Sequence, residues 1–176
     1  MPEVAVIDYG LGNLLSVSRG LEHCGARVVV TSDHDTILSA ARVVLPGVGA
    51  FAPGMAELRS RGLDAIVQKV AAQGSILLGI CLGMQMLLDE SDEFGKTEGL
   101  GIIPGRVVPI PSTTKDGFSQ KIPHIGWNNL VLPKSLNSWK DTLLQEINPG
   151  EADIKRFFEY LFILINFFVY VPIIHI

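Results

Sequence analysis

Short apolar runs alternate with stretches of helical spacing along the first eighty residues. The apolar runs end in turn residues, which is typical of strands, and they lie at residues 4–7, 27–30, 43–45 and 75–80. Between them, apolar residues recur every three or four positions, which predicts helices around residues 14–24, 34–41 and 55–70. Strands that are apolar on both faces and alternate with helices predict an α/β fold, a parallel sheet flanked by helices.

The pattern changes after Asp89. Residues 99–110 consist of short apolar runs with glycine and proline turns, so we expect a short antiparallel addition after residue 99. A second change comes near residue 153. All 18 glycines lie at or before Gly150, whereas seven of the 13 aromatic residues lie within residues 157–170. We therefore expect a domain at residues 1–152 and an atypical apolar, aromatic tail at residues 153–176.

Composition narrows the classes of function. The net charge is −4 without a long run of either sign, which does not favour a nucleic-acid surface. Residues 160–176 are almost wholly apolar, but this run is shorter than the ~20 residues of a spanning helix, and we expect no membrane segment. Two cysteines form no disulfide framework, and the N-terminus lacks the pattern of a signal peptide. These features predict a cytoplasmic protein.

The strongest chemical signal is residues 79–83, Gly-Ile-Cys-Leu-Gly, between a predicted strand and a predicted helix. This spacing is typical of a nucleophile elbow, in which glycines allow a strained turn that exposes the nucleophile. The helix N-terminus that follows Cys81 favours its thiolate. Residues 46–49, Pro-Gly-Val-Gly, end another strand and are either an ordinary turn or an oxyanion cradle of backbone N–H groups, with the Leu82 N–H as second donor.

Four motifs occur in order and closely resemble one family. They are residues 8–13 (Asp-Tyr-Gly-Leu-Gly-Asn), 45–51 (Leu-Pro-Gly-Val-Gly-Ala-Phe), 79–85 (Gly-Ile-Cys-Leu-Gly-Met-Gln) and 123–128 (Pro-His-Ile-Gly-Trp-Asn). Over residues 3–132 the chain resembles the glutaminase subunits of imidazole glycerol phosphate synthase, within the class I (triad) glutamine amidotransferases. The first and last motifs point to this histidine-pathway branch. The resemblance implies a flavodoxin-like parallel sheet.

The resemblance also implies roles for individual residues. Cys81 would attack the glutamine carboxamide and form a thioester, releasing ammonia to a (β/α)8 cyclase partner in a heterodimer. Gly49 and Leu82 would form the oxyanion hole. The substrate-binding positions would be Gly47, Gln85 and Glu93. The positions facing the partner would be Asn13, His124, Trp127 and Asn128. Neither a cofactor nor a metal is implied.

One part of the family pattern is missing. Relatives carry the catalytic histidine and glutamate in a late Phe-x-Phe-His-Pro-Glu motif, but no His-x-Glu occurs in these 176 residues. A cysteine hydrolase needs such a base, and His175, followed only by Ile176, does not match it. We expect a truncation or frame change near residues 135–153, and little or no glutaminase activity. A non-catalytic, partner-binding remnant and another cysteine hydrolase on the same fold are the alternatives.

The remaining candidates have structural interpretations. Cys24 lies on the apolar face of the first predicted helix, and we expect a core thiol. His34 lies in a charged loop and is expected to face water. His124 suits a role in facing a partner or bracing a loop, and Trp127 suits either a core or an interface.

Overall fold

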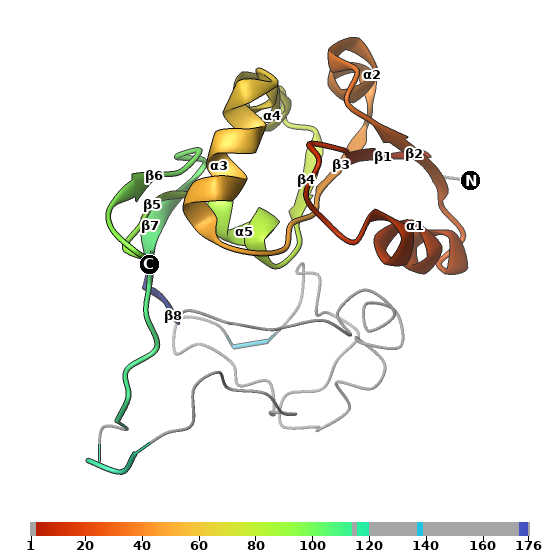
Figure 1. The fold of residues 1–176 in the computed structure, drawn as a ribbon. Coiled ribbons are helices and arrows are strands. Elements are labelled where there is room, and N and C mark those ends of the chain that lie inside the picture. Colours follow the sequence, from red (N-terminus) through yellow and green to blue (C-terminus); the bar gives the residue numbers. More distant parts are fainter. Residues whose placement is uncertain (1–2, 114–115, 120–136, 139–172, 176) are drawn as a thin grey trace.

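The computed structural model describes residues 3–113, 116–119, 137–138 and 173–175 (Figure 1). The strands of the first sheet are β1 (Glu3–Ile7), β2 (Arg27–Thr31), β3 (Arg42–Leu45) and β4 (Ile76–Gly79). The helices are α1 (Leu14–His23), α2 (His34–Ser39), α3 (Phe51–Ser60), α4 (Leu63–Ala72) and α5 (Leu82–Met86). The predicted alternation of strands and helices is confirmed. The helical stretch expected around residues 55–70 is divided into α3 and α4 at Gly62, which has a φ of 65°.

The first sheet is wholly parallel, with strand order β2-β1-β3-β4. Its alternate side chains serve two cores, because successive residues of a strand point to opposite faces. Val4 and Val6 of β1 pack in a cluster with Val17 of α1, whereas Ala5 and Ile7 belong to the larger cluster that includes α2, α3, α4 and α5. Figure 1 shows α1 on one side of the sheet and α2 and α4 on the other. The predicted fold class is confirmed.

A second, smaller sheet follows α5. Its strands are β5 (Leu88–Ser91), β6 (Thr97–Glu98), β7 (Ile103–Val108) and β8 (Ile173–His175), in the order β6-β5-β7-β8. The pairs β5–β6 and β7–β8 are antiparallel, but β5–β7 is parallel, so this sheet is mixed and begins at Leu88 rather than after residue 99. The apolar pattern did not predict a strand at residues 88–91, because two of these four residues are acidic.

Helix caps explain where the first two helices begin. The side chain of Asn13 accepts a hydrogen bond from the Ser16 N–H at 3.2 Å, and Asp33 does the same for Thr36 at 2.8 Å. Helix α1 ends at His23, and Cys24 is its C-cap. Cys24 is exposed there, so the prediction of a core thiol is wrong. Because the helix ends at His23, Cys24 does not join the apolar residues that face inward from α1.

Candidate active site

Cys81 sits in the turn between β4 and α5 with φ 55° and ψ −119°. Positive φ is unfavourable for a residue with a Cβ, and such outliers cluster at functional sites. The flanking glycines are needed for packing. A Cβ on Gly79 would lie 2.5 Å from the Met84 Cα, and a Cβ on Gly83 would overlap the Leu45 carbonyl oxygen. The local geometry is therefore the nucleophile elbow that the sequence predicts.

A cavity of about 800 Å³ opens at this elbow. Its lining combines the elbow, the glycine-rich loop and the segment after β5: Gly12, Asn13, Val48, Gly49, Ala50, Cys81, Leu82, Gln85, Glu93 and Phe94. Five of these were expected from the sequence to serve the reaction: Gly49, Cys81, Leu82, Gln85 and Glu93. A volume of this size is typical of a small-molecule site.

Burial controls the electrostatics of the nucleophile. Burial raises the pKa of the Cys81 thiol, and the hydrogen bond from the Leu82 backbone acts in the opposite direction with a smaller effect. The short α5 helix therefore does not produce the stabilised thiolate that its N-terminus predicted. A thiol with a raised pKa is mostly protonated at neutral pH, so nucleophilic attack requires a group that accepts its proton.

Glu93 lines the cavity and also holds helix α3 in place. Its carboxylate accepts a hydrogen bond from the Phe51 N–H at 2.7 Å, and Ala50, the N-cap, has no side-chain bond of its own. Glu93 therefore supplies the cap from 42 positions away. The Glu93 N–H donates to the hydroxyl of buried Ser91 at 3.1 Å, which fixes the other end of the residue. No local spacing could have predicted this long-range cap.

Gly47 and Gly49 occupy different places in the glycine-rich loop. Gly49, with φ 98°, lies at the cavity. Gly47 is buried behind it, where a Cβ would lie 2.7 Å from the Tyr9 hydroxyl and 2.8 Å from the Gly83 nitrogen. Within the described residues, Gly47 therefore packs against the elbow and does not line the cavity. Gln85 is buried and does line it.

The expected partner-facing residues divide into two groups. Asn13 caps α1 and lines the same cavity as Cys81. His124, Trp127 and Asn128 lie outside the described residues.

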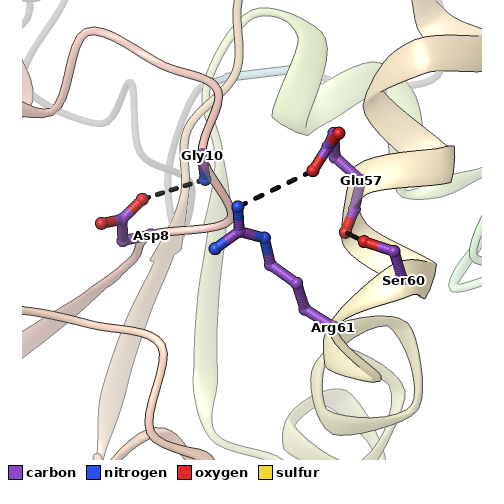
Figure 2. A network of polar contacts seen from close by, with 5 residues as sticks. All are labelled: Asp8, Gly10, Glu57, Ser60 and Arg61. Atoms are coloured by element: carbon purple, nitrogen blue, oxygen red, sulfur yellow. Dashed lines mark hydrogen bonds and ion pairs between the residues drawn. The ribbon is translucent and has the colours of Figure 1, made fainter.

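An arginine that the sequence did not single out braces the loop before Asn13. Figure 2 shows the Arg61 guanidinium between Gly10 and Glu57, with Glu57 at 3.7 Å. A Cβ on Gly10 would lie 2.6 Å from this guanidinium, and Asp8 accepts a hydrogen bond from the Gly10 N–H at 2.9 Å. His34, predicted to face water, is exposed and its Nε2 lies 3.1 Å from the Arg61 carbonyl oxygen. The pair with Glu57 is a local i,i+4 contact, whereas the position of Arg61 beside Gly10 depends on long-range contacts.

In the part of the chain that the structure describes, no group of three or more histidine, cysteine or acidic residues is arranged to hold a metal ion. Among the same residues, no helix combines the length and apolar character needed to cross a membrane.

The comparisons with known proteins agree with this geometry. A family model described as "Glutamine amidotransferase class-I" matches residues 5–147, so the chain belongs to the class-I glutamine amidotransferase family. A solved structure titled "Crystal structure of glutamine amidotransferase" shares the fold with a TM-score of 0.52 and 21% identity, covering 60% of this chain and 56% of the other.

Curated relatives narrow the likeness within the family. The chain is 49% identical to imidazole glycerol phosphate synthase subunit HisH 1 of Legionella pneumophila (strain Lens) over 147 residues, 84% of this chain and 69% of the relative. It is 50% identical to subunit HisH of Geobacillus sp. (strain WCH70) over 149 residues, 85% of this chain and 68% of the relative. The matches span about two thirds of each relative.

Proposed function

We propose that this chain is a glutaminase subunit of an imidazole glycerol phosphate synthase. In this proposal it hydrolyses glutamine and passes ammonia to a (β/α)8 cyclase in a cytoplasmic heterodimer. The cyclase would then release imidazole glycerol phosphate and an aminoimidazole carboxamide ribotide in histidine biosynthesis, a lyase step. The single observation that carries the proposal is Cys81 held at positive φ on an elbow that opens into a cavity lined by Gly49, Leu82, Gln85 and Glu93.

The chemistry begins with a thiolate. The Cys81 sulfur attacks the side-chain carbonyl carbon of glutamine, and the negative charge moves to the carbonyl oxygen. In this proposal the backbone N–H groups of Leu82 and Gly49, both of which line the cavity, bind that oxyanion. Such donors usually provide the largest single stabilisation in sites of this kind. The C–N bond then breaks, the nitrogen takes up a proton and leaves as ammonia, and a glutamyl thioester remains. Water hydrolyses the thioester to glutamate and restores the thiol.

Substrate recognition falls to the buried and charged groups of the cavity. Gln85 is buried there and carries both a donor and an acceptor. The carboxylate of Glu93 suits the α-ammonium group of an amino acid, while its bond to Phe51 fixes its position. The cavity of about 800 Å³ exceeds what one amino acid fills, which leaves room for a partner's residues or water at its mouth.

The Cys81 thiol must lose its proton before it can react, and this requirement favours a second candidate function for these 176 residues. Burial raises the pKa of the thiol, and no His-x-Glu pair is present in the sequence to remove its proton. In this second candidate, the polypeptide is a non-catalytic partner-binding module that binds substrate and partner without efficient turnover. Asn13, His124, Trp127 and Asn128 are proposed to face the partner.

Labelling with a glutamine-analogue diazoketone tests the site separately from turnover. We expect one equivalent to attach to Cys81 and excess glutamine to protect it. The Cys81→Ala variant is the matched control, because it keeps exposed Cys24 and so measures background reaction. Mass spectrometry locates the label. Labelling that glutamine does not slow would refute a glutamine site at this cavity.

Release of glutamate from glutamine tests whether the chain catalyses the reaction. For the partner-binding module we expect a rate close to that of Cys81→Ala, with and without the cyclase subunit of a relative, because the sequence contains no His-x-Glu pair. Turnover comparable to an intact relative would refute the argument from the absent His-x-Glu. Binding of that cyclase subunit without turnover would support the partner-binding module.

A further inference from the structure

The glycine-rich loop after β3 is packed tightly at its start and openly in its middle. A Cβ on Gly47 would lie 2.8 Å from the Gly83 nitrogen, so this part of the loop rests directly on the elbow. A Cβ on Gly49 would meet no atom of the described residues within 4 Å, and Val48 beside it is exposed. Packing on this side of Gly49 therefore does not fix its N–H, the proposed oxyanion donor. The orientation of that N–H depends on how the chain after Gly49 is held.

The peptide group that joins Ala50 to Phe51 is bound at both of its polar atoms. The Ala50 carbonyl accepts a hydrogen bond from the Gly54 N–H at 3.1 Å, which is the first bond of helix α3. The Phe51 N–H, which no carbonyl of its own helix can pair, donates to the Glu93 carboxylate at 2.7 Å. A bond of this length to a carboxylate is of the strong, charge-assisted kind. The backbone is therefore fixed two residues after Gly49.

Glu93 is itself held by the second sheet. The Asp92 N–H donates to the Val107 carbonyl of β7 at 2.9 Å. The Glu93 N–H donates to the hydroxyl of buried Ser91, in β5, at 3.1 Å. Phe94 follows with a φ of 53°, which is unfavourable for a residue with a Cβ, and such outliers cluster at functional sites. The second sheet thus provides a fixed base from which the Glu93 carboxylate reaches the glycine-rich loop.

We propose that Glu93 is a positioning residue for the oxyanion donor of Gly49. By holding the Phe51 N–H, its carboxylate sets the direction of the loop end that presents the Gly49 N–H to the cavity. Glu93 and Gly49 both line that cavity, so the bond joins two of its walls. This role is separate from the proposed contact of Glu93 with the substrate's α-ammonium group. The inference rests on the proposed function, because it requires an oxyanion to form beside Cys81.

The experiment compares two reagents that differ in whether they form an oxyanion. The Cys81 sulfur attacks p-nitrophenyl acetate at its carbonyl carbon, the negative charge moves to the carbonyl oxygen, and nitrophenolate then leaves an acetyl thioester. The sulfur attacks iodoacetamide at its methylene carbon, where iodide leaves and no oxyanion forms. At one pH, the ratio of the two rate constants reports the oxyanion site, because the thiolate fraction affects both reactions equally. Neither reagent carries an α-ammonium group.

Substitutions at Glu93 separate the reach of the side chain from its charge. The full 176-residue chain carries Cys24→Ser throughout, so that Cys81 is the sole thiol, and a Cys81→Ala chain measures background acetylation. Glu93→Gln keeps the length and an acceptor oxygen but loses the charge, whereas Glu93→Asp keeps the charge and is one methylene shorter. Glu93→Ala removes both. Asp33→Ala is the matched control, because it deletes a helix cap, the bond from the Thr36 N–H at 2.8 Å, away from the described cavity lining.

We expect Glu93→Asp and Glu93→Ala to lower the ratio of ester to iodoacetamide rate constants about tenfold. This is less than the ~10²–10³-fold cost of deleting an oxyanion donor, because the Gly49 N–H is misaligned and not removed. Glu93→Gln should keep most of the ratio, since its oxygen still reaches the Phe51 N–H. Asp33→Ala should lower the melting temperature, as loss of a cap does, and leave the ratio unchanged.

Three results would overturn the proposal. An unchanged ratio in Glu93→Asp would show that the oxyanion site does not need the tether, and this variant decides the matter even if Glu93→Ala does not fold. An equal fall in Asp33→Ala would show a general effect of lost stability. A fall in Glu93→Gln as large as in Glu93→Asp would show that charge and not reach is decisive. A failure of glutamine to protect Cys81 from the diazoketone would instead refute the proposed function, and the ratio would be unaffected.

Discussion

The backbone at Cys81 should be more stable with glycine than with alanine. At most positions the reverse holds, because glycine loses more conformational freedom on folding, at a cost of about 0.5–1 kcal/mol relative to alanine. Cys81, however, has φ 55° and ψ −119°. A sparsely populated conformation of this kind costs ~1–3 kcal/mol for a residue with a Cβ. At position 81 we therefore expect the glycine variant to be more stable than the alanine variant.

The size of this difference follows from comparing the cost of the positive φ with the entropic cost of glycine. Relief of the unfavourable conformation exceeds the entropic cost of glycine, so Cys81→Gly should have a free energy of unfolding about 1 kcal/mol higher than Cys81→Ala. That difference corresponds to a melting temperature about 2–4 °C higher for a chain of this size. Both variants lack the sulfur, so its burial cancels. Urea unfolding followed by far-ultraviolet circular dichroism measures the difference.

A second N-cap provides the control. Cys81 is the N-cap of α5, where glycine is a better cap than alanine and acts in the same direction. Ala50 is the N-cap of α3, has no side-chain cap bond, and has an ordinary φ of −89°. Ala50→Gly therefore measures the capping effect alone, and we expect a change within about 0.5 kcal/mol. A glycine advantage at position 81 no larger than at position 50 would refute the reasoning from backbone strain.

Three further predictions concern the same site. Gly83→Ala should lower the free energy of unfolding by about 3 kcal/mol or more, measured by urea unfolding, because its Cβ would overlap the rigid Leu45 carbonyl; full stability would contradict the close approach. Glu93→Gln should cost about 1 kcal/mol, because the charged cap on the Phe51 N–H becomes neutral, and it should also weaken glutamine protection of Cys81. Burial raises the folded-state pKa of Cys81, so its contribution to stability is complete below the unfolded-state value of about 8.5 and declines above it. Relative to Cys81→Ala, the native chain should therefore lose stability between pH 7 and pH 9.5.

Much of the first sheet could be predicted because its signals are local. Each strand is a short apolar run, and Asn13 and Asp33 are capping residues directly before their helices. The elbow was predictable for the same reason, since Gly79 and Gly83 flank Cys81 in a five-residue motif. In each case, neighbouring residues specify the conformation without help from distant ones.

The features that sequence reasoning missed depend on distant contacts. Burial reverses the expected effect of the α5 N-terminus on Cys81, and burial is a property of the whole fold. Glu93 was expected at the substrate only through family resemblance, and its bond to Phe51 joins segments 42 positions apart. Cys24 continued an apolar spacing, yet the helix ended one residue before it. Arg61 and Tyr9 carried no local signal of their contacts with Gly10 and Gly47.

Two features of the elbow decide which state of the nucleophile the fold favours. Cys81 has an unfavourable φ, and this conformational cost is present whether or not the sulfur is charged. Burial raises the pKa of the thiol, so it disfavours the charged sulfur and makes the protonated thiol the resting form. The hydrogen bond from the Leu82 backbone opposes this effect but is smaller. The elbow therefore holds a neutral thiol, and the supply of a proton acceptor decides whether the charged stages of the reaction are reached.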